Sequence, residues 1–203
     1  QIAPITQRLE NSKHIKMPKK VELDVTVDLP ESARKEYNRL ARDFLLEYEK
    51  GSVTALNAGV LSSKLRQVAN GGVYLDPEPF EDHSTGHYRK PTRQWIKLHD
   101  EKTVAAQEIV AELQGQGAII AFEFKHDKER LLSAFPNAPV IDGTTTDKQS
   151  KQILTQWNDR QHPVMLCHPS SAAHGLNMQS GGNHIIWYGM TYNLEWYIQL
   201  VAR

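Results

Sequence analysis

The residues whose types could bind a ligand gather in the last third of the chain. A short apolar run, 164–167, is followed by small and polar residues, Ser170-Ser171-Ala172-Ala173-His174-Gly175-Leu176-Asn177. Small residues after a strand let the backbone approach a ligand closely, and serine hydroxyls and backbone N–H groups bind phosphate oxygens. A tight strand-to-helix turn needs the same small residues for packing alone. On these residues by themselves, packing is the favoured interpretation.

Two residues further along could face the same ligand. Gln199 and Arg203 are four apart in a helix predicted over 193–203, so they share one helix face. Glu195 lies on that face too. The alternative to ligand binding is therefore that these three residues form a solvated stripe on the protein surface. His174 is a base by residue type, and a positioning role is preferred to direct contact with a ligand.

A basic run follows another apolar segment, 118–122. It contains Lys125, His126, Lys128 and Arg130. These side chains could meet DNA phosphates, or they could form the solvated start of a helix, and the sequence does not decide between the two. The aromatic residues between 187 and 197 could stack on bases, but packing roles are favoured.

The sequence lacks the parts of a complete nucleotide hydrolase. No G-x-x-x-x-G-K-[ST] phosphate loop occurs, and the acidic string at 99–102 begins a predicted helix with no strand before it. The histidines at 83, 87 and 99 fit no standard zinc spacing. No G-x-G-x-x-G follows a first strand, which disfavours a small-molecule Rossmann enzyme. A freestanding ATPase is therefore not predicted.

Composition narrows the class of protein. Lys and Arg number 24, as do Asp and Glu, so net charge gives no whole-chain argument for nucleic acid, and any such surface must be local. The single cysteine, Cys167, excludes an internal disulfide and is predicted to pack in the core. No segment resembles a signal peptide or a membrane span, so the cytoplasm is expected by default. Both ends are expected to be cut points, because the chain starts at Gln1 and stops inside a predicted helix.

Strands and helices are predicted to alternate from residue 99 onward. Helices are expected over 101–114, 126–134, 147–157 and 193–203, and strands over 118–122, 139–141, 164–167 and 185–188. Each strand is apolar throughout, which is typical of a parallel sheet covered on both faces. The sequence therefore predicts an α/β fold.

The first half of the chain has a different pattern of apolar and polar residues. Residues 1–20 are polar and basic, and 21–29 alternate strictly between apolar and polar residues, as a half-buried strand does. Helical spacing of apolar residues predicts helices over 33–49 and from 52 or 54 to 69, the second ending at Asn70-Gly71-Gly72. Residues 72–98 are interpreted as an irregular insertion that could include a hairpin.

Taken in order, these segments resemble the motifs of the Swi/Snf-type branch of the superfamily II helicase-like ATPases, most of all its phage and prophage members. Residues 168–179 resemble motif V, in which a small-residue run precedes His-Gly-Leu-Asn-Leu-Gln. Residues 121–126 resemble motif IV, and 192–203 resemble the approach to motif VI. Further family elements are matched by Leu65-Arg66-Gln67 with Asn70-Gly71, by 99–102, and by 141–143 with 156–158.

The resemblance implies a fold and a domain division. The expected fold is a RecA-like parallel sheet with helices on both faces, preceded by a linker and a helical insertion. Residues 1–29 would be the linker and a leading strand from lobe one, 30–98 the insertion, and 99–203 the second RecA-like lobe, truncated within motif VI.

The resemblance also implies a function. In this family ATP is bound between two lobes, and their closure pulls on double-stranded DNA. ATP would be bound by Gly175, Asn177, Gln199 and Arg203, with Arg203 also catalytic, and DNA by Ser170, Ser171 and Lys125. The partners would be double-stranded DNA and the N-terminal lobe of the same polypeptide. That lobe would hold the Mg²⁺ ligands, so no metal ligand is expected here.

Two departures from the family pattern affect these expectations. Ala172-Ala173 stand where relatives usually have a glycine. A second motif VI arginine, which in the family reaches the ATP γ-phosphate, would follow three residues after Arg203, so the fragment alone is expected to be inactive. The alternative is a non-enzymatic α/β binding module that has kept the shape of the lobe.

Overall fold

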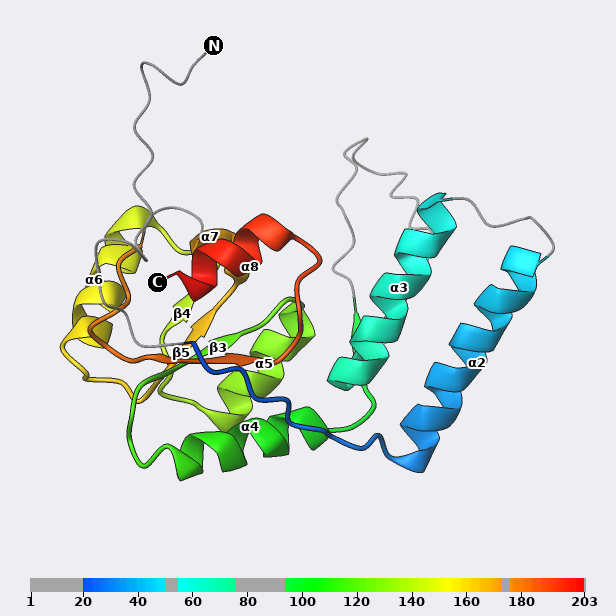
Figure 1. The fold of residues 1–203 in the computed structure, drawn as a ribbon, viewed down its shortest axis with the longest axis horizontal. Helices are drawn as coiled ribbons and strands as arrows, with labels where there is room; N and C mark the ends of the chain where they lie inside the picture. Colours follow the sequence, from blue (N-terminus) through cyan, green and yellow to red (C-terminus); the bar gives the residue numbers. More distant parts are fainter. Residues whose placement is uncertain (1–19, 50–54, 76–93, 173–175, 203) are drawn as a thin grey trace, which may run out of the picture.

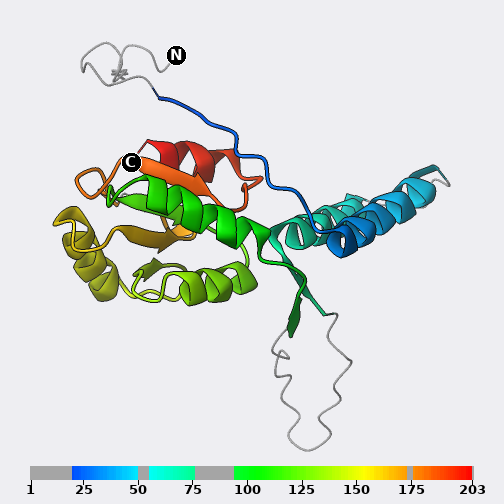
Figure 2. The same ribbon diagram turned by 90° about the horizontal axis from the view of Figure 1, so that it is seen from below.

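The structure is a computed structural model, and it describes residues 20–49, 55–75, 94–172 and 176–202. An α/β lobe and a pair of helices that project from it make up the described chain (Figure 1). Segment 20–30 runs from the lobe toward the first projecting helix (Figure 2).

A four-stranded parallel sheet forms the centre of the lobe. Its strands are β3 (Ala118–Ala121), β4 (Val140–Ile141), β5 (Val164–Cys167) and β6 (His184–Trp187), in the order β4-β5-β3-β6. Ile120 of β3 lies level with Leu166 of β5 on one side and with Ile186 of β6 on the other. The predicted parallel strands are confirmed, and each begins and ends within about one residue of its expected bounds.

Two layers of helices cover the sheet, which explains why its strands are apolar throughout. One face packs against α4 (Glu101–Glu112) and α5 (Lys125–Ala134), which contribute Ala106 and Leu131. The other face packs against α6 (Asp147–Asn158) and α8 (Leu194–Val201), which contribute Trp157 and Leu200. Alternate strand residues enter the two hydrophobic clusters, so every strand position is needed to fill a core.

The helices next to the predicted site begin at side-chain caps. Thr146 accepts a hydrogen bond from the backbone N–H of Gln149, and the Gln149 side-chain oxygen accepts one from the backbone N–H of Thr146. Asn193 accepts from the backbone N–H of Trp196 and fixes the first turn of α8. These contacts satisfy backbone donors that the first helical turn leaves free.

The part of the chain before the lobe is largely helical, as predicted. Helices α2 (Glu31–Glu49) and α3 (Ala55–Asn70) pack against each other, and α3 leads into β1 (Gly72–Tyr74). Strand β1 pairs in antiparallel fashion with β2 (Trp95–Lys97) as a two-stranded ribbon separate from the main sheet. The expected hairpin is thus present, while the intervening residues 76–93 lie outside the described part of the chain.

The prediction of a strand over 21–29 is wrong. The described residues 20–30 form no strand or helix, and Val21 and Leu23 are 76% and 84% exposed. Alternation of residue types is not sufficient, because a strand also needs a neighbouring edge that accepts its backbone hydrogen bonds. The segment instead rests on the lobe through side chains, since Lys20 and Glu22 both contact the Tyr197 hydroxyl on α8.

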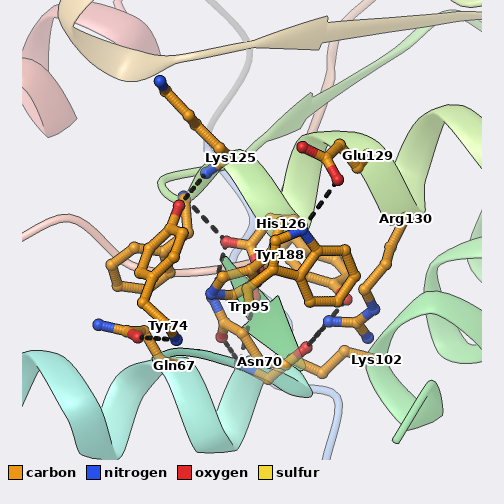
Figure 3. Close-up of polar contacts among 12 residues, drawn as sticks. Gln67, Asn70, Tyr74, Trp95, Lys102, Lys125, His126, Glu129, Arg130 and Tyr188 are labelled. Atoms are coloured by element: carbon orange, nitrogen blue, oxygen red, sulfur yellow. Dashed lines mark hydrogen bonds and ion pairs between the residues drawn. The ribbon is translucent and has the colours of Figure 1, made fainter. Parts of the chain in front are cut away.

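A buried arginine joins the lobe to the part of the chain that contains α2, α3, β1 and β2, which is called the insertion below. Helix α3 ends at Asn70, and Gly71 follows in the left-handed region with φ of 97°. The guanidinium of Arg130 on α5 donates to the backbone carbonyl of Asn70 and, at 2.8 Å, to that of His99 (Figure 3). A Cβ at Gly71 would lie 2.3 Å from the His99 carbonyl oxygen, so only glycine fits this turn.

Lys102 and Tyr188 complete this junction, which consists of Asn70, His99, Lys102, Asp127, Arg130 and Tyr188. The Lys102 ammonium donates to the Asn70 side-chain oxygen at 2.8 Å and to the Tyr188 carbonyl at 3.1 Å. The Asn70 amide donates to Asp127, and the Tyr188 hydroxyl donates to the Asn70 carbonyl. Burial lowers the pKa of Lys102 and raises the pKa of Tyr188 to about 12. Residues from α3, α4 and α5 and from the segments that follow β2 and β6 therefore meet in one polar network.

Replacing Arg130 with methionine should destabilise the protein strongly. The substitution keeps the side-chain length but leaves the buried His99 carbonyl without its donor and the Asn70 carbonyl with the Tyr188 hydroxyl alone. We expect the free energy of unfolding to fall by about 3–5 kcal/mol in urea titrations. Arg39→Met is the control, because Arg39 is 53% exposed in a surface pair with Glu36, and it should cost about 1 kcal/mol or less. Equal losses in the two variants would contradict the role given to Arg130.

His99 should make stability sensitive to acid. Its Nε2 lies 2.9 Å from the Val68 carbonyl, which only accepts, so the neutral ring carries its proton on Nε2. Burial lowers the pKa of His99, and the charge of Arg130 acts in the same direction. The unfolded chain therefore takes up a proton below about pH 6.5 before the folded chain does, and stability falls as the pH drops through that window, by at most about 1.4 kcal/mol per pH unit. His99→Gln keeps a donor for Val68 and should flatten this fall between about pH 7 and 5; parallel profiles for variant and parent would refute the assignment.

Candidate functional site at the carboxyl edge of the sheet

Parallel strands bring the loops that follow them to one edge, here called the carboxyl edge. Strand β3 leads to Glu123 and Phe124, β5 to His168, and β6 to the loop 188–193. In open α/β sheets, ligands bind outside the carboxyl ends of the strands. Most residues predicted from the sequence follow these strands, so this edge is the candidate site.

His168 organises the start of the loop after β5. Its ring packs edge-on against Phe122 and Trp196, with centroids 5.7 and 6.1 Å away. Burial lowers the pKa of His168, which favours the neutral ring. Its Nδ1 lies 2.7 Å from the Ser170 hydroxyl and 3.3 Å from the Ser170 backbone N–H, and the backbone donor requires Nδ1 to accept. The short helix α7 (Pro169–Ala172) begins at this contact.

The two predicted DNA-binding serines are half-buried at this edge. With Nδ1 as an acceptor, the Ser170 hydroxyl proton points to His168, so the hydroxyl can act toward a ligand only as an acceptor. The Ser171 backbone N–H donates to the His168 carbonyl at 2.9 Å. A phosphate oxygen would therefore compete with internal acceptors for these donors. The sequence indicated the small residues but not the histidine that holds them.

The residues predicted to bind ATP lie along the other side of the site. Asn177 is exposed, and its side-chain oxygen accepts from the Gln179 backbone N–H. Its neighbours Leu176 and Met178 pack with the core on the side of α6 and α8. Gln199 on α8 donates to Glu195 at 2.9 Å, while its side-chain oxygen is buried without a partner. Gly175, His174 and Arg203 lie outside the described residues.

The basic run after β3 mostly faces inward. Lys125 alone of the four is exposed, and its backbone N–H donates to the Tyr74 hydroxyl at 2.9 Å. His126 is fully buried and stacks on Phe124, whereas Lys128 pairs with Asp142 at 2.7 Å. Arg130 belongs to the junction. The sequence suggested that all four residues could meet DNA or form a solvated helix start. This is wrong for His126 and Arg130, which are buried because the hairpin β1–β2 covers this turn (Figure 3).

A cluster at this edge was not predicted as a unit. It consists of Ser62, Arg66, Glu123, Phe124 and Tyr192, called the Arg66 cluster below. The Arg66 guanidinium forms an ion pair with Glu123 and lies 4.3 Å from the centroid of the Tyr192 ring. Arg66, the Glu123–Phe124 pair and Tyr192 fall in three separate segments of the sequence, which resemble the Leu-Arg-Gln element, motif IV and the approach to motif VI. Their meeting depends on the docking of α3, which the sequence does not reveal.

A surface pocket of about 400 Å³ lies elsewhere. It opens between α5 and α6 beside β4, and its lining includes Lys128, Asp142, Thr144 and Gln149. Burial alone would raise the pKa of Asp142, but hydrogen bonds from Lys128 and Thr144 hold it at about 2. None of the predicted site residues lines this pocket, so it carries no argument about the candidate site.

The described residues include neither a metal-binding cluster nor a membrane-spanning helix. They contain no group of three or more His, Cys, Asp or Glu side chains placed to hold a metal ion. No helix among them has both the length and the apolar character needed to cross a membrane.

Comparison with known proteins agrees with this arrangement. Protein p41 of Acyrthosiphon pisum secondary endosymbiont phage 1 is 31% identical over 202 residues, which cover 100% of this chain and 40% of p41. An uncharacterized ATP-dependent helicase of Mycoplasma genitalium, MG018, is 29% identical over 182 residues, which cover 86% of this chain and 16% of the helicase. The chain thus spans less than half the length of either relative.

The fold has a counterpart among solved structures. The C-terminal domain of the Sulfolobus solfataricus SWI2/SNF2 ATPase superposes with a TM-score of 0.58 at 16% sequence identity, covering 84% of this chain and 72% of that one. Residues 101–203 match the family model of the helicase conserved C-terminal domain, and this match includes the whole sheet and its covering helices. The chain therefore belongs to the helicase conserved C-terminal domain family, and its lobe has the RecA-like fold of the C-terminal lobe of SWI2/SNF2 ATPases.

Proposed function

We propose that the chain is the second lobe of a two-lobed motor that hydrolyses ATP and translocates on double-stranded DNA. The observation that carries the proposal is the packing of α7 against α8, because these helices belong to the two segments that resemble motifs V and VI. Membership of the helicase C-terminal family supports the assignment. A nucleotide held between two lobes stabilises their closed arrangement, and closure moves the two DNA contacts relative to each other.

The described residues suggest that different parts of the lobe bind DNA and ATP. Ser170, Ser171 and Lys125 follow β5 and β3 directly, and we assign them to the DNA backbone. Asn177 and Gln199 lie on the side covered by α6 and α8, and we assign them to ATP. The buried Gln199 oxygen without a partner fits this role, because a buried acceptor is costly unless a ligand or a neighbouring group satisfies it.

Gly175 and Arg203 complete the proposed ATP group by their position in the sequence. Arg203 is proposed to act in catalysis by binding the ATP phosphates, beside the second motif VI arginine that in the family reaches the γ-phosphate. Mg²⁺ would neutralise the β- and γ-phosphates, and its ligands are assigned to the first lobe, because the described residues offer no cluster of carboxylates.

A non-enzymatic binding module of the same shape is the second candidate. It is favoured by the zero net charge and by the absence of a phosphate loop from the 203 residues. The inward hydrogen bonding of Ser170 also suits a turn that serves packing alone. DNA binding and ATP hydrolysis separate the two candidates.

This chain should bind double-stranded DNA weakly and through charge. We expect a dissociation constant on the order of micromolar or weaker, with the logarithm of affinity falling linearly as the logarithm of salt concentration rises. Lys125→Ala should weaken binding and reduce the salt slope by about one, as expected for the loss of one phosphate contact. Lys151→Ala, an exposed lysine on α6, is the matched control and should leave the slope unchanged. Nanomolar, salt-insensitive binding in fluorescence anisotropy would contradict a backbone-contacting lobe.

ATP hydrolysis should require both lobes. The chain alone should show no ATPase above background with or without DNA, whereas a polypeptide that combines it with a phosphate-loop lobe and a complete motif VI should hydrolyse ATP and be stimulated by DNA. In that polypeptide Arg203→Ala should lower turnover by about 10²-fold or more, because a positive charge at the ATP phosphates is lost. Arg39→Ala on α2 serves as the control, and circular dichroism checks the fold of both variants. Unchanged turnover in Arg203→Ala would remove Arg203 from the ATP group.

A further inference from the structure

The Arg66 cluster connects three segments that lie far apart in the sequence. Arg66 is on α3, Glu123 and Phe124 follow β3, and Tyr192 precedes α8. The guanidinium carbon lies 4.3 Å from the Tyr192 ring centroid and 5.4 Å from that of Phe124, so the cation lies against both aromatic rings. The Tyr192 hydroxyl lies 2.9 Å from Ser62 Oγ, one helical turn before Arg66. Two loops of the carboxyl edge are thus attached to one helix of the insertion.

The position of Arg66 does not suit a direct phosphate contact. Glu123 neutralises its charge, and the side chains of both partners are only 20% exposed. An arginine that binds DNA needs an uncompensated charge that faces solvent. Stacking and ion pairing instead use the planar guanidinium on its face and on its edge, a geometry that lysine cannot reproduce.

Tyr192 has no comparable support from the lobe itself. The residue is 72% exposed, and it lies in the loop between β6 and the cap of α8. Its described contacts are those to Ser62 and Arg66 on α3. The described contacts that position the Tyr192 side chain therefore come from the insertion rather than from the sheet beneath it.

We propose that Arg66 is a positioning residue, which holds the loops after β3 and β6 in the arrangement that the carboxyl edge needs to bind DNA. The inference rests on the proposed function, because it assigns the same edge to DNA. It adds that the insertion controls this edge: a change in the orientation of α3 moves Arg66, and Arg66 moves both loops. DNA binding by the lobe is then coupled to the insertion without any direct contact between the insertion and the DNA.

The experiment measures binding of a fluorescein-labelled DNA duplex to this chain by anisotropy over a range of salt concentrations. The variants are Arg66→Ala, Arg66→Lys, Tyr192→Ala and the double variant Arg66→Ala/Tyr192→Ala. Arg39→Ala is the control, because Arg39 is also ion-paired on an insertion helix but contacts no loop of the edge among the described residues. Thermal unfolding of each variant and amide hydrogen exchange of residues 189–193 accompany the binding measurements.

We expect Arg66→Ala to weaken binding about 3- to 10-fold with an unchanged salt slope, a loss in the range of one cation–π contact. Tyr192→Ala should weaken it similarly, and the double variant should be no weaker than the weaker single variant, because both release the same loop. Arg66→Lys keeps the charge opposite Glu123 but not the stacking, so it should fall between parent and Arg66→Ala. Exchange at 189–193 should accelerate in Arg66→Ala and not in Arg39→Ala.

Two results would overturn the proposal. A salt slope reduced by about one in Arg66→Ala, with losses additive in the double variant, would make Arg66 a direct phosphate contact. Unchanged binding in Arg66→Ala would show that the edge does not depend on it. If the parent chain does not bind the duplex at all, the proposed function fails for this lobe, and hydrogen exchange alone decides the inference: unaltered exchange at 189–193 in a folded Arg66→Ala variant would reject it.

Discussion

The buried guanidinium of Arg130 is the interaction on which the arrangement of this protein depends. It donates to two backbone carbonyls where α3 ends and where the chain enters α4, two points of the insertion boundary that are 29 residues apart in sequence. A backbone carbonyl removed from water must have a donor, and arginine has five N–H groups in a fixed plane with which to supply several at once. Because Gly71 has no side chain, the guanidinium can reach both carbonyls. The position of the helical pair relative to the lobe follows from this one contact and from the network around Lys102 and Tyr188.

The parallel sheet imposes the second constraint. All four strands run in one direction, so the segments that follow them must emerge together, whatever their separation in sequence. That geometry gathers Glu123, His168 and Tyr192 at one edge, although they belong to three different connections. The insertion then reaches the same edge through Arg66. The lobe supplies the strand ends, and the insertion supplies part of the support for the loops above them.

The lobe was predictable from sequence because its strands are buried on both faces and therefore apolar at every position. Val164–Cys167 has no polar residue to confuse the assignment, and its neighbours are separated by helix-length connections. Segment 21–29 shows the limit of such patterns, since its alternation is as regular as that of any strand, yet no described edge lies beside it. The inward orientation of His126 and Arg130 could not be predicted either. A basic residue at the start of a helix is usually solvated, and only the position of the hairpin β1–β2 encloses this turn. At the site, residue types indicated Ser170 and Lys125 but not the role of the His168 ring, which accepts a hydrogen bond from the Ser170 hydroxyl.

The extended segment near the start of the described chain presents its apolar side outward. Lys20 and Glu22 contact Tyr197 on the lobe, so alternation turns Val21 and Leu23 to the solvent, with unpaired backbone groups along both edges. Such a segment would ordinarily invite a neighbouring molecule to add a strand. Its other side carries Glu22, Asp24 and Asp28, and any pairing of two copies that matches their apolar residues would also set acidic residues opposite or next to one another. Like charges across a pair of strands are destabilising, so self-association through this segment is opposed. Glu22 and Asp28 are already paired with Lys20 and Arg34, so Asp24 carries most of this protection against strand addition by a second copy.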